Sequence, residues 1–324
     1  MKRFVDGLII VVLVVLTVWV FSYQKDEYAK RHDENMFLVK NGAGLGRDVY
    51  VPRNPKRVVI LSTASFDMWV NLGGADSIVG VPHFANADQT LYERVGSKTT
   101  ILGPYSYKSP EMILHLQPDL VIMNGFDGVQ DFMGECLNRE NIPLLSMPCR
   151  SVEDTYKEIE LFGFLLNNSQ QAESEIARIR KNIAANQEKY ASVQKQTALL
   201  IFGTPTSFSM FTPYTRQGDM LELACGENVI QRSLQFLGSK YIPLSLEYAA
   251  LKDPDHVFFI NHGRVEVMAR KTKEALADSS AWYTIRAVKE GRVHILPPEY
   301  FITNPGLNTD YAVGRLSQIL YEGQ

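Results

Sequence analysis

One phrase occurs twice in this chain of 324 residues, and it constrains the fold more than any other feature of the sequence. The first copy, SPEMILHLQPDLVIM, covers residues 109–123, and the second, SLEYAALKDPDHVFFI, covers residues 245–260. Each copy reads as a short helix that begins at a capping serine, a Pro-Asp pair that ends the helix, and a buried apolar strand. We therefore predict two similar halves, each with a helix leading into a buried strand.

Short apolar runs alternate with helical segments in both halves. In the first half the runs cover residues 57–62, 77–82, 119–125 and 142–148, and in the second half they cover residues 197–203, 255–263 and 291–297. Continuous runs of Val, Ile and Leu suit parallel strands that helices cover on both faces. We expect the stretch 204–217 to be a loop after the first strand of the second half. The chain thus reads as an α/β protein.

The change of pattern at residue 151 divides the chain into two lobes. We predict an N-terminal α/β lobe over residues 46–150 and a C-terminal α/β lobe over residues 169–324. The segment 151–168 begins with a capping serine and acidic residues of a first helical turn, so we expect an interdomain helix there. Residues 24–45 are expected to form a polar tether and the start of a hairpin.

The N-terminus carries an apolar run behind two basic residues, Lys2 and Arg3. Its length lies between the apolar core of a signal peptide and the roughly 20 residues that span a bilayer. We therefore expect residues 1–23 to be a signal peptide or an N-terminal membrane anchor, with residues 4–21 attaching the protein to the membrane if they are retained. The basic residues favour a cytoplasmic N-terminus, which places everything after Ser22 outside the cytoplasm.

Charge and cysteine content exclude several functional classes. The formal net charge is −3 and no basic stripe is present, so no nucleic-acid partner is expected. The three cysteines are dispersed and none forms a CxxC pair, which indicates neither a disulfide framework nor a structural zinc site. The sequence has no glycine-rich phosphate loop, GxSxG or HExxH motif, so an enzyme on a doubly wound fold is the less favoured alternative.

Six blocks of the sequence resemble, in order and spacing, the extracytoplasmic substrate-binding proteins of iron-siderophore, haem and cobalamin ABC importers. The blocks are RVVILSTASFDMWVNLGGADSIVGVP, SPEMILHLQPDLVI, LELACGENVI, SLEYAALKDPDHVFF, AWYTIRAVKEGRVHILP and NPGLNTDYAVGRLSQILY. The resemblance runs from about residue 46 to residue 321. It implies two Rossmann-like lobes joined by a long rigid helix, a ligand cleft between the lobes, and a binding protein without catalysis.

Glu111 and Glu247 occupy equivalent positions in the first turns of the two repeated helices. Considered alone, such residues need do no more than complement the helix dipoles. The family resemblance implies more, because family members carry one docking glutamate per lobe that pairs with arginines on an ABC permease dimer. A two-fold symmetric partner would also account for the internal repeat.

The loops that follow the strands are expected to contact the ligand, because ligands of parallel α/β folds bind outside the carboxyl ends of the strands. Aromatic rings concentrate in these loops and suit a large, flat or apolar ligand, although about half of them are expected only to brace their loops. The candidate ligand-binding residues are His83, Phe84, Tyr105, Phe126, Tyr214, Arg216, His262, Tyr300 and Phe301.

The predicted ligand is an iron complex, either a ferric siderophore or haem, and no permanently bound cofactor is expected. His83 and His262 each follow a strand, one per lobe, and would ligate the iron if the ligand is haem. Otherwise no residue is expected to bind a metal directly. A cobalamin-binding protein and a binder of free zinc or manganese remain alternatives, and the latter is expected to show more histidines near the cleft than these two.

Overall fold

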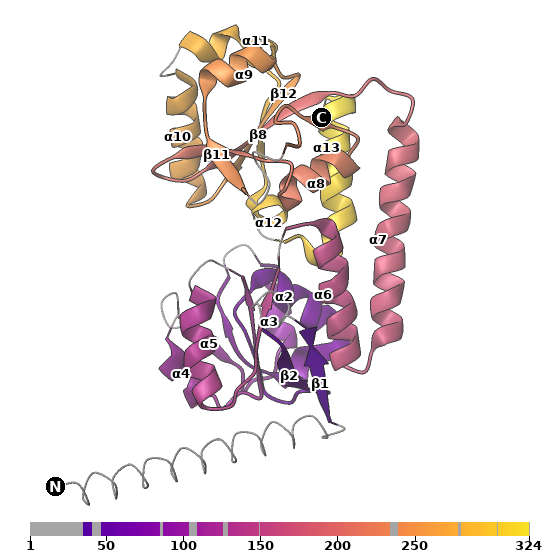
Figure 1. Cartoon of the computed structure of the whole chain (residues 1–324), viewed down its shortest axis with the longest axis vertical. Coiled ribbons are helices and arrows are strands. Elements are labelled where there is room, and N and C mark those ends of the chain that lie inside the picture. Colours follow the sequence, from indigo (N-terminus) through magenta and orange to yellow (C-terminus); the bar gives the residue numbers. More distant parts are fainter. Residues whose placement is uncertain are drawn as a thin grey trace, which may run out of the picture.

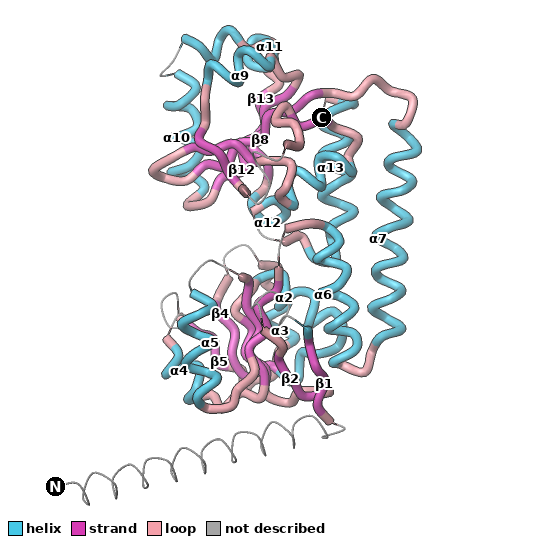
Figure 2. Tube along the Cα trace, in the orientation of Figure 1, coloured by secondary structure: helices cyan, strands magenta, loops and turns pink. Residues whose placement is uncertain are grey.

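Two β-sheets form the cores of two lobes, and two helices join the lobes along one side (Figure 1). This computed structural model describes residues 35–40, 47–84, 87–103, 109–125, 129–148, 150–233, 239–277, 280–302 and 304–323. Strands lie in the interior of each lobe and helices pack around them (Figure 2). The predicted α/β class and the two lobes are confirmed.

The first lobe is built on five parallel strands in the order β5-β4-β3-β6-β7. They are β3 (Val58–Ile60), β4 (Ile78–Pro82), β5 (Thr100–Leu102), β6 (Leu120–Asn124) and β7 (Leu144–Met147). The surrounding helices and turns are α2 (Thr63–Trp69), η2 (Val70–Gly74), η3 (Ala75–Ser77), α3 (Thr90–Arg94), α4 (Pro110–His115) and α5 (Val129–Arg139). Strands β3, β6 and β7 are buried along almost their whole length, as their continuous apolar sequences predict.

A two-stranded antiparallel hairpin precedes this lobe. It consists of β1 (Met36–Val39) and β2 (Val49–Pro52), and the residues 41–46 between them lie outside the described part of the chain. The ring of Phe37 lies 4.5 Å from the ring of Phe164, which attaches the hairpin to the helices that join the lobes. The strands of the predicted hairpin are confirmed.

The second lobe contains a mixed sheet in the order β11-β9-β8-β12-β13, with β10 beside β8. Its strands are β8 (Thr197–Gly203), β9 (Phe208–Phe211), β10 (Glu227–Asn228), β11 (Tyr241–Pro243), β12 (His256–Asn261) and β13 (Val293–Leu296). Its helices and turns are α8 (Arg216–Leu223), α9 (Leu246–Lys252), α10 (Val265–Ala277), η6 (Ser280–Thr284), α11 (Arg286–Lys289), α12 (Pro298–Phe301), η7 (Gly306–Asn308) and α13 (Thr309–Glu322).

Strand β9 corrects one expectation, because residues 204–217 are not a simple loop. Strand β9 pairs antiparallel with β8 on one side and with β11 on the other. The ring of Phe211 is 1% exposed and belongs to the core. The short β9 strand depends on pairing with β11, a much later part of the chain, and no local pattern in the sequence signals such a partner.

The two repeated Pro-Asp pairs follow the ends of α4 and α9, as expected, and their aspartates also make long-range hydrogen bonds that the sequence did not predict. Asp119 accepts hydrogen bonds from the backbone N–H groups of Lys56 and Arg57, at 2.7 and 3.0 Å, just before β3. Asp255 accepts bonds from the N–H and the hydroxyl of Thr197, both at 2.8 Å, at the start of β8. In each lobe the aspartate therefore joins the helix end to the beginning of a neighbouring central strand.

Helices α6 (Val152–Leu165) and α7 (Ser169–Tyr190) lie antiparallel and connect the lobes (Figure 1). The expected helix at 151–168 corresponds to α6, which begins with a capping box formed by Ser151 and Asp154. The carboxylate of Asp219, on α8 of the second lobe, also accepts a hydrogen bond from the Val152 N–H at 2.7 Å. Helix α6 thus starts at the second lobe and packs against the first.

Helix α7, with 22 residues, runs beside both lobes and is bonded to each. Near its first turn, the side chains of Asn168 and Gln171 donate to the carbonyl groups of Leu72 and Asn71 in the first lobe. Further along, α7 bonds to α13 of the second lobe through the pairs Arg178–Asp310, Asn186–Ser317 and Lys189–Glu322. These contacts at both ends resist rotation of one lobe against the other.

The predicted signal peptide or membrane anchor, residues 1–23, lies outside the described residues, as does most of the tether. Among the helices that the structure does describe, none combines the length and the apolar character needed to cross a lipid bilayer.

Candidate ligand-binding cleft

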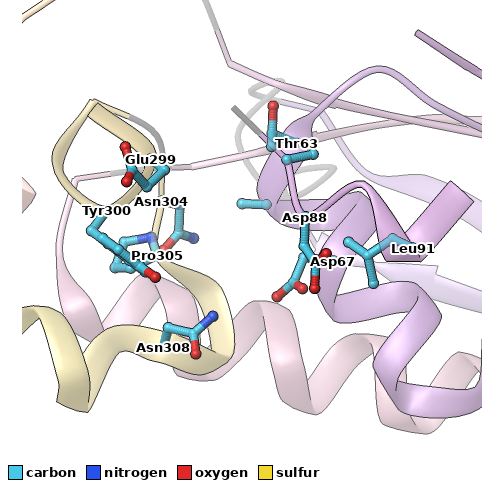
Figure 3. A pocket seen from close by; sticks show the side chains of 11 residues that line it. Thr63, Asp67, Asp88, Leu91, Glu299, Tyr300, Asn304, Pro305 and Asn308 are labelled. Carbon is cyan, nitrogen blue, oxygen red and sulfur yellow. The ribbon is translucent and has the colours of Figure 1, made fainter. Parts of the chain in front are cut away.

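A cavity of about 400 Å³ opens between the two lobes. Figure 3 shows Asp67 and Asp88 of the first lobe on one side, with Tyr300, Asn304 and Asn308 of the second lobe on the other. The residues that line it are Thr63, Ala64, Asp67, Ala87, Asp88, Leu91, Glu299, Tyr300, Asn304, Pro305 and Asn308.

The lining residues come from loops and helices that follow strands. Thr63 and Ala64 open α2 directly after β3, and residues 87–91 follow β4. From the other lobe, residues 299–308 follow β13. The carboxyl ends of parallel strands from both lobes therefore face the same space, which is where α/β folds bind their ligands. The predicted cleft between the lobes is present.

The wall of the first lobe carries a carboxyl group, that of Asp67, whose pKa is raised. Burial, and next the nearby Asp88 carboxylate, raise the pKa of Asp67 to about 6. The side chain of Asn71 donates a hydrogen bond to Asp67 at 3.0 Å and opposes this rise. By contrast, hydrogen bonds from the backbone and hydroxyl of Thr90 lower the pKa of Asp88. Near neutral pH this wall is negatively charged, and it gains a proton in mildly acidic solution.

Behind the cavity, a buried polar cluster links the lobes. Glu158 of α6 is 1% exposed, and its carboxylate accepts a hydrogen bond from the Ser65 hydroxyl at 2.5 Å. On its other side lies the amide of Asn304, whose Nδ2 is 3.4 Å from Oε2 of Glu158. Burial raises the pKa of Glu158 to about 7, although the Ser65 hydroxyl and the Arg216 charge favour its ionised form.

His83 and His262, the candidate iron ligands, both lie at the carboxyl ends of strands, as expected. His83 follows β4, is exposed and stacks on Tyr92, with ring centroids 5.6 Å apart. His262 follows β12, is exposed and lies near Phe202. Neither is among the described residues that line the cavity.

Two of the candidate aromatic residues are partly buried and braced by other side chains. The N–H of Phe84 donates to the hydroxyl of Tyr92 at 2.7 Å, and its ring packs near Phe66. The hydroxyl of Tyr214 donates to the carbonyl of Ser233 at 3.1 Å. Both therefore have contacts that fix their own loops.

The remaining described candidates differ in their surroundings. Tyr300 lines the cavity and packs against Tyr311, with ring centroids 4.9 Å apart. Phe301 is 1% exposed and lies in the core instead, because the short helix α12 turns its two adjacent rings in different directions. Arg216 is 3% exposed at the start of α8, where its charge acts on Glu158. Tyr105 and Phe126 lie outside the described residues.

Sequence reasoning gave no ligand-binding role to Asp67, Asn304 or Asn308. The only local signal was position, since Asp67 lies in the helix after a strand and Asn304 follows a predicted strand and loop. Polar residues in such loops are common, and their convergence depends on how the lobes pack. Across the part of the chain that the structure describes, no group of three or more histidine, cysteine or acidic residues could hold a metal ion.

The two predicted docking glutamates lie on exposed surfaces in equivalent local structures. Ser109 caps α4 and Ser245 caps α9, and each serine hydroxyl also bonds to the glutamate two residues later. Both carboxylates are fully solvent-accessible, and hydrogen bonds from the serine and the glutamate's own backbone lower the pKa of each. Glu111 and Glu247 therefore carry negative charge at physiological pH.

A family model described as periplasmic binding protein matches residues 58–300, which include strands of both lobes and residues on both walls of the cavity. The chain belongs to the periplasmic binding protein family. Family members bind ligands rather than catalyse reactions, in agreement with the predicted class. The resemblance inferred from the sequence blocks is confirmed.

Among periplasmic binding proteins, several relatives are similar to this chain. The petrobactin-binding protein YclQ of Bacillus subtilis is 24% identical over 298 residues, covering 88% of this chain and 86% of that protein. The heme uptake protein IsdE of Staphylococcus aureus is 25% identical over 178 residues, covering 53% of this chain and 58% of that protein. An ABC transporter substrate-binding protein from Listeria monocytogenes has the same fold, with a TM-score of 0.69, 22% identity, and coverage of 82% and 99% of the two chains.

Proposed function

We propose that this protein is the substrate-binding component of an ABC importer that captures an iron complex outside the cytoplasm and delivers it to a permease. The observation that carries the proposal is the cavity between two lobes, lined at the carboxyl ends of strands from both. The names of the relatives support an iron complex as the ligand, because one binds petrobactin and another belongs to a heme uptake system.

Within this function, a ferric siderophore and haem remain the two ligand candidates. The petrobactin-binding relative matches most of this chain, whereas the heme uptake relative matches about half of it. His83 and His262 are exposed after strands of opposite lobes, so their imidazoles are accessible to a haem iron. Neither ligand is a resident cofactor, since each is cargo that the protein releases to the permease.

Docking to the permease is proposed to use Glu111 and Glu247. Each is an exposed, ionised carboxylate in the first turn of a helix, one in each lobe. Arginines related by the two-fold axis of a permease dimer would meet one carboxylate from each lobe, which fixes the orientation of docking more than its affinity. Residues 1–23 are proposed to direct the protein out of the cytoplasm and, if retained, to hold it at the membrane through residues 4–21.

Titration of the purified protein with two probes tests the proposed ligand class. With haemin, an intense shifted Soret band that His83→Ala or His262→Ala abolishes identifies haem. The matched control is His115→Ala, because His115 is exposed on α4 and is expected to leave the band unchanged. With ferric petrobactin, saturable quenching of protein fluorescence without any haemin response identifies the siderophore. If neither probe binds at micromolar concentration, the iron-complex proposal is rejected.

A further inference from the structure

Glu158 is buried, and its carboxylate contacts both lobes through two different partners. Ser65, its partner in the first lobe, immediately follows the cavity residues Thr63 and Ala64. Asn304, its neighbour in the second lobe, lines the cavity itself and is 4% exposed. One side chain on the connecting helix α6 thus lies behind both walls of the cavity.

The hydrogen bonds of Asn304 define which of its amide atoms faces Glu158. Its Oδ1 accepts from the Thr155 hydroxyl at 2.9 Å and from the N–H of Gly306 at 3.1 Å. The backbone N–H of Gly306 can only donate, so it opposes a rotation that would exchange Oδ1 and Nδ2. The N–H donor of Asn304 is therefore directed at Glu158, where only an acceptor makes a favourable contact.

One nearby charge favours the ionised form of Glu158, in opposition to the burial that raises its pKa. Arg216 on α8 is the cation that acts on Glu158, and it is itself almost fully buried. The acidic group that opposes ionisation is Asp154, one turn earlier on α6. A neutral residue at position 158 would remove a negative charge that interacts favourably with Arg216.

We propose that Glu158 is a positioning residue for ligand binding, because its carboxylate holds the wall formed by Ser65 and its neighbours and the wall formed by Asn304 at a fixed separation. The inference rests on the proposed function, since the cavity is taken as the ligand site. Glu158 does not line the cavity, so it acts through Ser65 and Asn304 and not by touching the ligand. Its contacts also set the geometry of the empty cavity, which can be measured without any ligand.

Three variants of the full chain separate positioning from a general loss of stability. Glu158→Gln replaces two carboxylate oxygens by one amide oxygen, so either the N–H of Asn304 or the Ser65 hydroxyl loses its acceptor, and Asn304→Asp places two carboxylates together. The double variant restores one donor facing one acceptor, in the reverse direction, and keeps a negative charge near Arg216. Glu160→Gln is the matched control, because Glu160 is exposed on the same helix and the charge change is identical.

Hydrogen–deuterium exchange of the ligand-free proteins is the first measurement. We expect amides in residues 62–67 and 304–309 to exchange about tenfold faster in each single variant, because a lost hydrogen bond to a charged group changes a local opening equilibrium by about that factor. The double variant is expected to return to within about threefold of the wild type. The amide of Gly306 is the most direct reporter, since it bonds to Asn304.

Affinity for haemin and for ferric petrobactin is the second measurement. Whichever probe the wild type binds should bind each single variant about tenfold more weakly and the double variant with nearly wild-type affinity. The positioning role is overturned if Glu158→Gln matches Glu160→Gln in both measurements, or if the double variant shows the sum of the two single effects. If the wild type binds neither probe, the proposed function fails, while the exchange data still decide the role of Glu158.

Discussion

Glu111 and Glu247 have the same relationship to the serine that caps each helix: Ser109 Oγ donates to Glu111 at 2.6 Å, and Ser245 Oγ donates to Glu247 at 3.0 Å. The serine therefore performs two functions, capping the helix and orienting the carboxylate. Because both bonds stabilise the ionised form, each lobe presents a fixed negative charge on its surface.

Replacing either glutamate should impair delivery without affecting capture. We expect Glu111→Ala and Glu247→Ala each to lower the rate of iron-complex uptake by cells about tenfold, because each removes one of two charge pairs that orient docking. Affinity of the purified variants for the ligand should be unchanged. Glu188→Ala, which removes an exposed acid on α7, serves as the control. Wild-type uptake by the Glu111→Ala/Glu247→Ala double variant would contradict the docking role.

The packing of α6 against α7 depends on the absence of a side chain at Gly163. A Cβ at this position would overlap the Cβ of Ala172. Gly163→Ala should therefore destabilise the protein by about 2 kcal/mol, as overpacking of a close helix contact does. Gly314→Ala on α13 is the matched substitution, since nothing lies within 4 Å of its new methyl group.

In contrast to Gly163→Ala, Gly314→Ala should stabilise the protein by about 0.5–1 kcal/mol, because alanine has a higher helix propensity than glycine. Urea unfolding of the two variants beside the wild type measures both changes. Equal effects of the two substitutions would show that helix propensity, and not the α6–α7 contact, decides the result.

The carboxyl group of Asp67 should make stability depend on pH in a defined direction. Its pKa of about 6 in the folded protein lies above the value near 3.9 in an unfolded chain. Between these two pH values the folded state binds a proton that the unfolded state does not. The contribution of Asp67 to folding stability is therefore largest below pH 4 and is lost as pH rises through 6.

Asp67→Asn keeps an acceptor for Asn71 and removes the charge beside Asp88. We expect this variant to be more stable than the wild type by on the order of 1 kcal/mol at pH 8, with a smaller advantage at pH 5. Urea unfolding at the two pH values measures the difference. An advantage that does not change with pH would assign the effect to packing and not to ionisation.

His256, at the start of β12, and His294, within β13, form a pair. This pair should make stability depend on pH in the direction opposite to that of Asp67. Nδ1 of His256 lies 3.2 Å from Nε2 of His294, and burial, followed by the charges of His294 and Arg292, lowers the pKa of His256 to about 4. An unfolded histidine titrates near 6.5, so in the window from 6.5 to 4 only the unfolded state gains this proton. Stability present above pH 6.5 is therefore lost as pH falls towards 4.

Thermal unfolding of His256→Gln over this range tests the pair. The variant should lose less stability than the wild type between pH 6.5 and 4, by on the order of 2 kcal/mol. His115→Gln, at an exposed position of α4, should keep the wild-type slope. A parallel slope for His256→Gln would show that His256 does not remain neutral in the folded protein. The slope is the relevant quantity, because the substitution also alters packing.

The sequence by itself determined the features that depend on neighbouring residues. Serine at positions 109 and 245 caps its helix, and Pro118 and Pro254 follow the ends of the same two helices, as the repeated phrase predicted. Local hydrogen bonding and apolar periodicity act over a few residues, so they can be read directly from the chain. The α/β class, the two lobes and the family followed from the order of these local units.

Only the tertiary structure decided which side chains meet in the cleft. Glu158 joins Ser65 and Asn304 across 93 and 146 positions of the chain, and no periodicity links those three residues. Tyr300 lines the cavity while the adjacent Phe301 lies in the core, although the sequence predicted both residues to be aromatic residues of a ligand-binding loop. The physical reason is that burial and long-range hydrogen bonds depend on how the two lobes pack against α6 and α7, and this packing is a property of the whole folded chain.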